Sequence, residues 1–218
     1  MTDGHDGGSP PTGVVELPMF PLGNVLLPSA LLSLHVFEPR YRAMARHCMD
    51  NDRRLGVVLI ERGSEVGGGD VRFDVATRAV IADAVELDDG RWVMILAGED
   101  RVRVRRWLDD DPYPRAEVVP CEDGPVGPEA PARRDELQRV LRRVLDMKAE
   151  LGEESGDPAV KLSPEPTVAT WQAVGLAPLG PLDAQRVLGT DGADDRLEAV
   201  LSLLEEEAAV LAQRVAGG

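Results

Sequence analysis

The sequence has few lysines, few cysteines and few aromatic side chains, and its charge is strongly of one sign. Its 218 residues hold 39 acidic and 24 basic side chains, a formal net charge of −15. Nearly all of the basic side chains are arginines, since only Lys148 and Lys161 are lysines. A polyanion disfavours non-specific binding to nucleic acid and to acidic membranes. We therefore expect no membrane partner, and a nucleic-acid partner is disfavoured.

The two cysteines, Cys48 and Cys121, lie far apart and outside any CxxC motif. A disulfide framework is therefore not expected, and reduced thiols in the cytoplasm are the simpler interpretation. The first residues lack the basic and apolar stretches of a signal peptide, so we predict a disordered tail over residues 1–13. The expected location is the cytoplasm.

Motifs for catalysis and for cofactors are missing from the sequence. There is no GxxxxGK[ST] loop for phosphate and no GxSxG around a nucleophile. The three histidines, His5, His35 and His47, are isolated from one another and from the cysteines, without metal-ligand spacing. We therefore predict a protein that is not an enzyme, with no catalytic residue, no metal and no cofactor.

The sequence also lacks a long uninterrupted hydrophobic run. The stretch "ELPMFPLGNVLLPSALLSLHVFEPRYRAM", Glu16–Met44, is almost free of charge over most of its length, but Pro18, Pro21 and Pro28 interrupt it. A membrane span needs roughly 20 consecutive apolar residues. Prolines and glycines at this spacing indicate short strands and turns instead.

Short apolar or alternating segments follow one another through the first half of the chain and predict β-strands. In Leu31–Phe37 the residues Leu32, Leu34 and Val36 alternate with polar or larger neighbours, and "DDG" at Asp88–Gly90 predicts a hairpin. The strands expected are Val14–Leu17, Val25–Leu27, Leu31–Phe37, Leu55–Glu61, Val75–Leu87, Arg91–Ala97, Arg101–Trp107 and Tyr113–Val119. We interpret residues 14–120 as one β domain, a small barrel or pseudobarrel.

One early helix is expected directly after the third strand. Pro39 suits a first helical position, where a missing N–H has no cost. The apolar stripe that follows has helical spacing and consists of Tyr41, Met44, Ala45, Cys48 and Met49. We interpret Glu38, Pro39, Arg40 and Tyr41 as a structural junction, in which Arg40 pairs with Glu38 or another acid.

The second half of the chain changes to helical periodicity. Residues 121–131, "CEDGPVGPEAP", are rich in proline and glycine and predict a linker. Residues 132–215 then predict a helical bundle, with Asp183 and Asp194 as candidate helix caps. The expected fold class is α+β, a β pseudobarrel with one early helix followed by an α-helical bundle.

A candidate binding surface lies in the turn "LPSAL", where Leu27, Pro28, Ala30 and Leu31 can form an exposed apolar loop. Exposed apolar patches are typical of interaction sites. The alternative is that these side chains belong to the core, which is the commoner state of leucine and is favoured for most of them. Leu31 and the Pro28 turn are the best candidates for exposure.

The segment "RVRVRRW" is a second candidate surface. Strand alternation puts Arg101, Arg103, Arg105 and Trp107 on one face, a pattern suited to RNA. The alternative is a solvated strand face whose arginines pair with Glu99, Asp100 and the acids at 109–111. The net charge of −15 favours the second interpretation.

The opening segment resembles the substrate-binding domain of Lon, the N-terminal, PUA-like domain of that ATP-dependent protease. The matching segments are Leu17–Leu22, Val25–Pro28, Leu34–Tyr41 and Leu55–Ile60. "RWVMILAGEDRVRVRRW" resembles a later hairpin of the family. In the helical part the matching positions are Gln185, Asp191, Arg196 and Leu197. Where the family has a "GT-A-I" stretch this sequence has "VATRAVI", without the glycine.

The resemblance implies a PUA-like fold that recognises polypeptide, unfolded or degron-bearing, as an adaptor or binding module in protein quality control. It implies polypeptide substrates, a protease or a chaperone as partners. The ATPase and protease modules of Lon have no counterpart in this sequence, so neither activity is expected. RNA binding remains the alternative because PUA-like folds include RNA binders, and a homodimer is left open.

Overall fold

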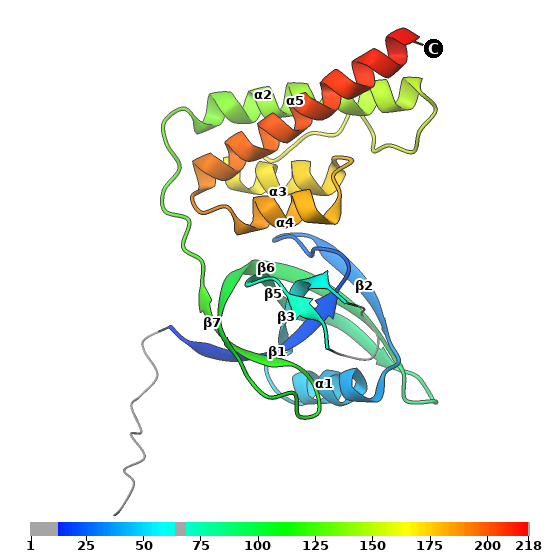
Figure 1. Ribbon diagram of the computed structural model, residues 1–218, viewed down its shortest axis with the longest axis vertical. Coiled ribbons are helices and arrows are strands. Elements are labelled where there is room, and N and C mark those ends of the chain that lie inside the picture. Colours follow the sequence, from blue (N-terminus) through cyan, green and yellow to red (C-terminus); the bar gives the residue numbers. More distant parts are fainter. Residues whose placement is uncertain (1–12, 64–68, 218) are drawn as a thin grey trace, which may run out of the picture.

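Strands form the N-terminal part of the protein in the computed structural model, which describes residues 13–63 and 69–217 (Figure 1). The predicted tail therefore lies almost wholly outside the described residues. The strands are β1 Val15–Leu22, β2 Leu31–Val36, β3 Arg54–Arg62, β4 Val71–Arg72, β5 Val75–Glu86, β6 Trp92–Trp107 and β7 Arg115–Pro120. Helix α1, Pro39–Asp50, follows β2. The predicted fold class is confirmed.

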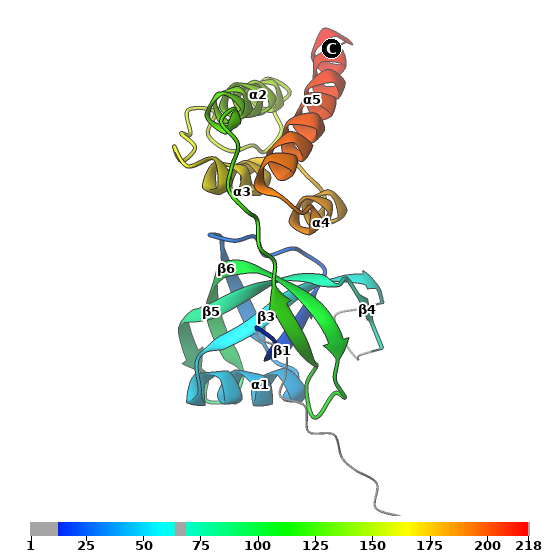
Figure 2. The same cartoon turned by 90° about the vertical axis from the view of Figure 1, so that its left-hand side faces the viewer.

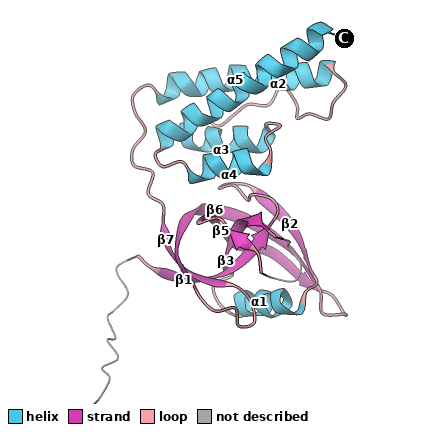
Figure 3. Ribbon diagram, viewed as in Figure 1, coloured by secondary structure: helices cyan, strands magenta, loops and turns pink. Residues whose placement is uncertain are grey.

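The sheet closes on itself through its first strand. Its strands are ordered β1-β7-β6-β5-β3-β4, and β1 also pairs with β3, in parallel, through Met19 to Leu22. The remaining pairings are antiparallel, and β2 lies beside β6 off this path. We call this ring of strands together with α1 the β unit (Figure 3).

Alternation along the strands and the stripe of α1 fill the interior of the ring. In β2, Leu34 and Val36 are buried while Ser33 and His35 are exposed, as predicted. Helix α1 buries Tyr41, Met44, Ala45 and Cys48 against the strands, and the Tyr41 ring stacks on Phe20 with 4.4 Å between centroids. Pro39 occupies the first turn of the helix, as predicted.

Two strand predictions were wrong. Residues 25–27 form no strand. The Leu26 carbonyl accepts a hydrogen bond from the Thr77 hydroxyl at 2.5 Å instead of pairing with a neighbouring strand. The two strands expected at Arg91–Ala97 and Arg101–Trp107 are one continuous strand, β6, whose pairings with β5 and β7 shift register instead of breaking.

Four helices form the rest of the described chain, and we call them the helical unit. They are α2 Ala130–Glu150, α3 Pro166–Leu176, α4 Pro181–Gly189 and α5 Ala193–Gly217. Helices α3 and α4 lie next to the strands, whereas α1 lies on the opposite side of the β unit (Figures 1 and 2). In the described ranges, no helix combines the length and the apolar character needed to cross a membrane.

Some helix boundaries differ from the expected ones. Helix α2 begins at Ala130, inside the predicted linker, so the division at residues 121–131 stays a prediction. Asp183 and Asp194 are not caps: helices α4 and α5 begin at Pro181 and Ala193, and both aspartates lie in the first turn. Asp194 instead accepts a hydrogen bond from the Gly127 backbone at 2.8 Å, which fastens the chain before α2 to α5.

Candidate binding site

The turn between β1 and β2 lies against the helical unit, and two of its candidate residues are not exposed. Leu27 is 6% exposed and belongs to the apolar core of the helical unit. Pro28 is buried as well. The burial of Leu27 is the state that the sequence favoured for most of these side chains. The expectation that the Pro28 turn is exposed is wrong, because helix α3 and the segment before it cover this turn.

The other two candidate residues remain accessible. Ala30 is half-buried, and its backbone N–H donates to the Leu27 carbonyl at 3.1 Å. Ser29 between them has φ 65°, the left-handed region, which allows the chain to reverse. Leu31 follows with 72% of its surface exposed, the state that the sequence favoured for it.

An apolar groove of about 270 Å³ lies where the turn meets the helical unit. We call it the inter-unit groove. The turn contributes Pro28, Ser29 and Ala30, and the helical unit contributes Val160, Lys161, Leu162, Trp171, Gln172, Gly175 and Leu176. An apolar side chain that enters this groove would be transferred from water to an apolar environment. Leu31 follows the lining residue Ala30 in sequence. The sequence did not reveal the helical wall, because Trp171 lies on an apolar helix and such a residue is usually core.

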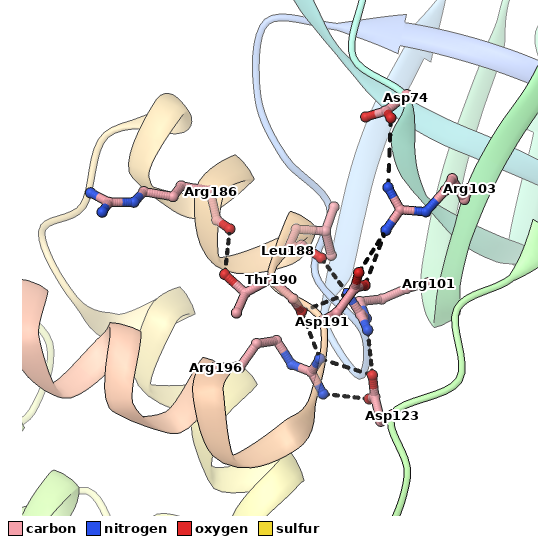
Figure 4. A network of polar contacts seen from close by, with 9 residues as sticks. All are labelled: Asp74, Arg101, Arg103, Asp123, Arg186, Leu188, Thr190, Asp191 and Arg196. Atoms are coloured by element: carbon pink, nitrogen blue, oxygen red, sulfur yellow. Dashed lines mark hydrogen bonds and ion pairs between the residues drawn. The ribbon is translucent and has the colours of Figure 1, made fainter.

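Beside the groove, a network of arginines and an aspartate joins the two units (Figure 4). The Arg101 guanidinium donates to the carbonyls of Leu188 and Thr190 at 2.7 and 3.0 Å, and also to Asp123. Arg196 donates to the same Asp123 and to Thr190, at 2.8 and 3.0 Å. Asp123 therefore holds an arginine of β6 and an arginine of α5 together.

Burial sets the electrostatics of this network. The side chains of Arg101 and Arg196 are 2% and 1% exposed, so both charges have lost most of their water. Desolvation lowers the pKa of Arg196, and the hydrogen bond from Arg196 to Asp123 opposes that shift. The Arg196 guanidinium also lies 4.9 Å from the centroid of the Trp171 ring, which itself lines the inter-unit groove.

The positions that matched the family in the helical half take part in the same junction. Asp191 accepts from Arg103 at 3.0 Å, and the Gln185 amide donates to the Val75 carbonyl at 3.0 Å. Leu197 is buried in the core of the helical unit. Gln185, Asp191 and Arg196 thus each bind a residue outside the helical unit.

The basic stripe expected on one strand face does not exist. Arg101 is buried in the junction, and Arg103 binds Asp191 and Asp74. Arg105 is exposed, but it lies at a register shift in β6. Trp107 is half-buried, and its ring centroid lies 4.6 Å from the Arg72 guanidinium. The arginines do pair with acids, but with others than expected: Glu99 and Asp100 bind Arg54 and Arg78, and Asp110 binds Arg72.

At the junction before α1, the ion pair that the sequence predicted between Arg40 and Glu38 is present. Arg40 binds Glu38 at 3.2 Å, and its guanidinium lies 4.4 Å from the centroid of the Tyr41 ring. Tyr41 is 3% exposed, and burial raises its pKa to about 12. These contacts join the end of β2 to the start of α1.

Comparison with known proteins places most of the chain in one family. The model of the ATP-dependent protease La (LON) substrate-binding domain matches residues 16–206. The Lon protease of Anaeromyxobacter dehalogenans is 25% identical over 201 residues, which cover 89% of this chain and 24% of that protein. The Lon protease of Roseiflexus castenholzii is 28% identical over 206 residues, 93% of this chain and 25% of that protein. This chain therefore spans about a quarter of the length of these relatives.

Solved structures agree with that match. The crystal structure of a Lon N-terminal domain protein from Xanthomonas campestris superposes with a TM-score of 0.62 and 30% identity, over 86% of this chain and 98% of that one. The N-terminal domain of a Mycobacterium avium complex Lon protease gives the same TM-score of 0.62 at 14% identity, over 88% of this chain and 98% of that one. The second likeness concerns the fold alone.

Proposed function

The chain belongs to the Lon substrate-binding-domain family, and on that premise we propose that it is a non-catalytic module that binds unfolded or degron-bearing polypeptide segments. The observation that carries the proposal is the inter-unit groove, whose lining residue Ala30 is followed in sequence by the exposed Leu31. Apolar side chains that are buried in a folded protein are accessible in an unfolded one, and the groove offers them an apolar environment.

The size of the groove supports weak and reversible binding. Burying one leucine or phenylalanine side chain contributes roughly 1.5–3 kcal/mol. A groove of about 270 Å³ has room for few such side chains, and association has its own entropic cost. We therefore expect micromolar or weaker affinity. Since the protein carries a formal charge of −15, basic or neutral segments are favoured over acidic ones.

We propose that the bound segments are handed to a protease or a chaperone in the cytoplasm, so that the protein acts as an adaptor. The relatives named Lon protease support this role, and their proteolytic activity is a property of those longer proteins. The free thiols of Cys48 and Cys121 are consistent with a reducing compartment.

The test is a titration of the protein with a fluorescently labelled, permanently unfolded model polypeptide. Wild type should bind, and Leu31→Asp should weaken binding about tenfold, because it places a charge beside the groove. Val210→Asp is the matched control, since Val210 is 53% exposed on α5 and outside the groove. Its affinity should equal that of wild type.

Two results would count against the proposal. Absence of binding by the wild-type protein removes polypeptide recognition altogether. Equal affinities for wild type, Leu31→Asp and Val210→Asp would show that any binding occurs away from the inter-unit groove.

A further inference from the structure

A second cleft, of about 220 Å³, runs along strand β2 on the β unit. We call it the β2 cleft. Its walls are Phe20 and Leu22 of β1, the residues from Ser33 to Phe37, and Glu38 and Tyr41 at the start of α1. Consecutive residues of β2 line it, so the cleft follows the backbone edge of the strand rather than one face.

Within residues 13–63 and 69–217, no strand neighbours that edge of β2. Among the described residues, β2 pairs with β6 alone, in the register Leu31 with Ala97. The Ala30 carbonyl accepts from the Gly98 N–H at 2.9 Å, which continues this register by one residue. Backbone groups of an antiparallel strand alternate between its two edges. The backbone N–H and C=O groups that point away from β6, toward the open edge, are therefore those of Leu31, Ser33 and His35.

The Tyr41 hydroxyl is a buried polar group at this cleft. Its side chain is buried and lines the β2 cleft, yet its hydroxyl has no hydrogen-bond partner within the described part of the protein. A buried hydroxyl without a partner is costly and rare in native proteins. The Tyr41 ring stacks on Phe20, with 4.4 Å between the ring centroids.

We propose that the edge of β2 binds an extended segment of unfolded polypeptide as an added strand, with a polar atom of that segment hydrogen-bonded to the Tyr41 hydroxyl. The inference rests on the proposed function and assigns a second contact surface to it. Strand addition supplies main-chain hydrogen bonds that are independent of sequence, which suits a protein that binds many polypeptides.

Charge selects an unfolded segment rather than a second copy of this protein. Glu38 lines the β2 cleft but is paired with Arg40 at 3.2 Å, so the charge of the whole protein decides between the two: a second copy brings the same formal charge of −15. Extended segments with basic and apolar residues carry the opposite charge. Leu31 and Phe37, which are 72% and 56% exposed, flank the edge and offer contacts to apolar side chains of such a segment.

The experiment uses a short fluorescein-labelled peptide of alternating valine and lysine, measured by anisotropy at physiological salt. Its N-methylated twin keeps every side chain and loses the backbone donors. Wild type should bind the parent peptide about tenfold more tightly than the twin, because strand addition depends on those donors. Electrostatic attraction alone would treat the two peptides alike.

Substitutions at two positions test the protein side. Ser33→Pro removes a donor on the open edge and should bind the parent peptide about fivefold more weakly than Ser33→Ala, which keeps that donor. Tyr41→Phe removes the hydroxyl alone and should weaken binding by about five- to tenfold. Its melting temperature should not fall, since the lost hydroxyl has no hydrogen-bond partner among the described residues.

The outcomes separate this inference from the proposed function. Equal binding of the parent peptide and its twin, or wild-type affinity in both Ser33→Pro and Tyr41→Phe, overturns strand addition while polypeptide binding at the inter-unit groove stands. Failure of the wild type to bind any peptide or unfolded protein overturns both. A dimer that forms with concentration and is lost in Ser33→Pro assigns the edge to a second copy and also overturns the inference.

Discussion

At the scale of single residues, two neutral side chains on the buried face of α1 make stability depend on alkaline pH. Burial raises the pKa of Cys48 from 9.0 to about 12 and that of Tyr41 from 10.0 to about 12. The Cys48 thiol also donates to the Arg54 carbonyl at 3.4 Å. Because the folded pKa exceeds the unfolded one, each group contributes fully below its unfolded pKa, and the contribution is lost as pH rises toward 12.

We therefore predict that the melting temperature falls steadily between about pH 9 and pH 12. Cys48→Ala should flatten the first part of this decline, from about pH 9 upward, and Tyr41→Phe the part above about pH 10. Thermal denaturation followed by circular dichroism over this pH range measures both slopes. Slopes identical to that of wild type in the two variants would contradict the assignment.

Arg40 provides a second prediction at this scale. It binds Glu38 at 3.2 Å, and its side chain is 18% exposed. Arg40→Ala should lower the free energy of unfolding by about 1 kcal/mol, through loss of the ion pair and of packing on the Tyr41 ring. Urea denaturation measures the change. Arg46→Ala is the control on the same helix, because its ion pair with Glu86 is half-exposed and should matter little. An unchanged midpoint for Arg40→Ala would contradict the structural role.

At the scale of elements, the features that could be predicted from the sequence are those with local causes. The alternation of β2 and the stripe of α1 follow from residues a few positions apart, and both were correct. Pro28 and Arg101 were misplaced because their surroundings come from far along the chain: Pro28 lies against α3 and the segment before it, and Arg101 binds the carbonyl of Leu188. Strand periodicity carries no information about which helix will cover a strand.

The inter-unit groove was only half predictable for the same reason. One wall is formed by the "LPSAL" turn, which the sequence analysis selected as a candidate exposed apolar loop. Its helical wall depends on how α3 lies against that turn, which is a tertiary contact. The family match in the helical half did find junction residues, Gln185, Asp191 and Arg196, although no local pattern explained why they were there.

Gly98 tests how closely the turn is fitted to β6. A side-chain Cβ at this position would lie 2.3 Å from the Leu27 carbonyl oxygen, a backbone atom that cannot move aside cheaply. Gly98→Ala should therefore cost about 2 kcal/mol of stability and disturb the turn. Gly189→Ala is the matched control, since a Cβ at Gly189 meets nothing within 4 Å. Denaturant titration of both variants gives the comparison. Equal midpoints would show that the turn can move to accommodate the Cβ at Gly98 without a loss of stability.

At the scale of the whole molecule, two kinds of contact couple the β unit to the helical unit. Leu27 packs into the helical core, and Asp123 binds Arg101 of β6 together with Arg196 of α5. The inter-unit groove has one wall on each unit, so its shape depends on their relative position. A weaker junction should therefore alter polypeptide binding even though none of its residues lines the groove.

Asp123→Ala tests this coupling because it leaves two buried guanidinium groups without their shared carboxylate. Such a loss should lower the free energy of unfolding by about 2 to 3 kcal/mol. Hydrogen exchange followed by mass spectrometry should show α3, α4 and α5 losing protection while the strands of the β unit retain theirs. Asp191→Ala is the control, since Asp191 binds Arg103 in an exposed pair at the same junction. If Asp123→Ala instead lowered protection equally in both units, the two units would unfold together. The network would then stabilise the whole fold rather than determine the shape of the inter-unit groove.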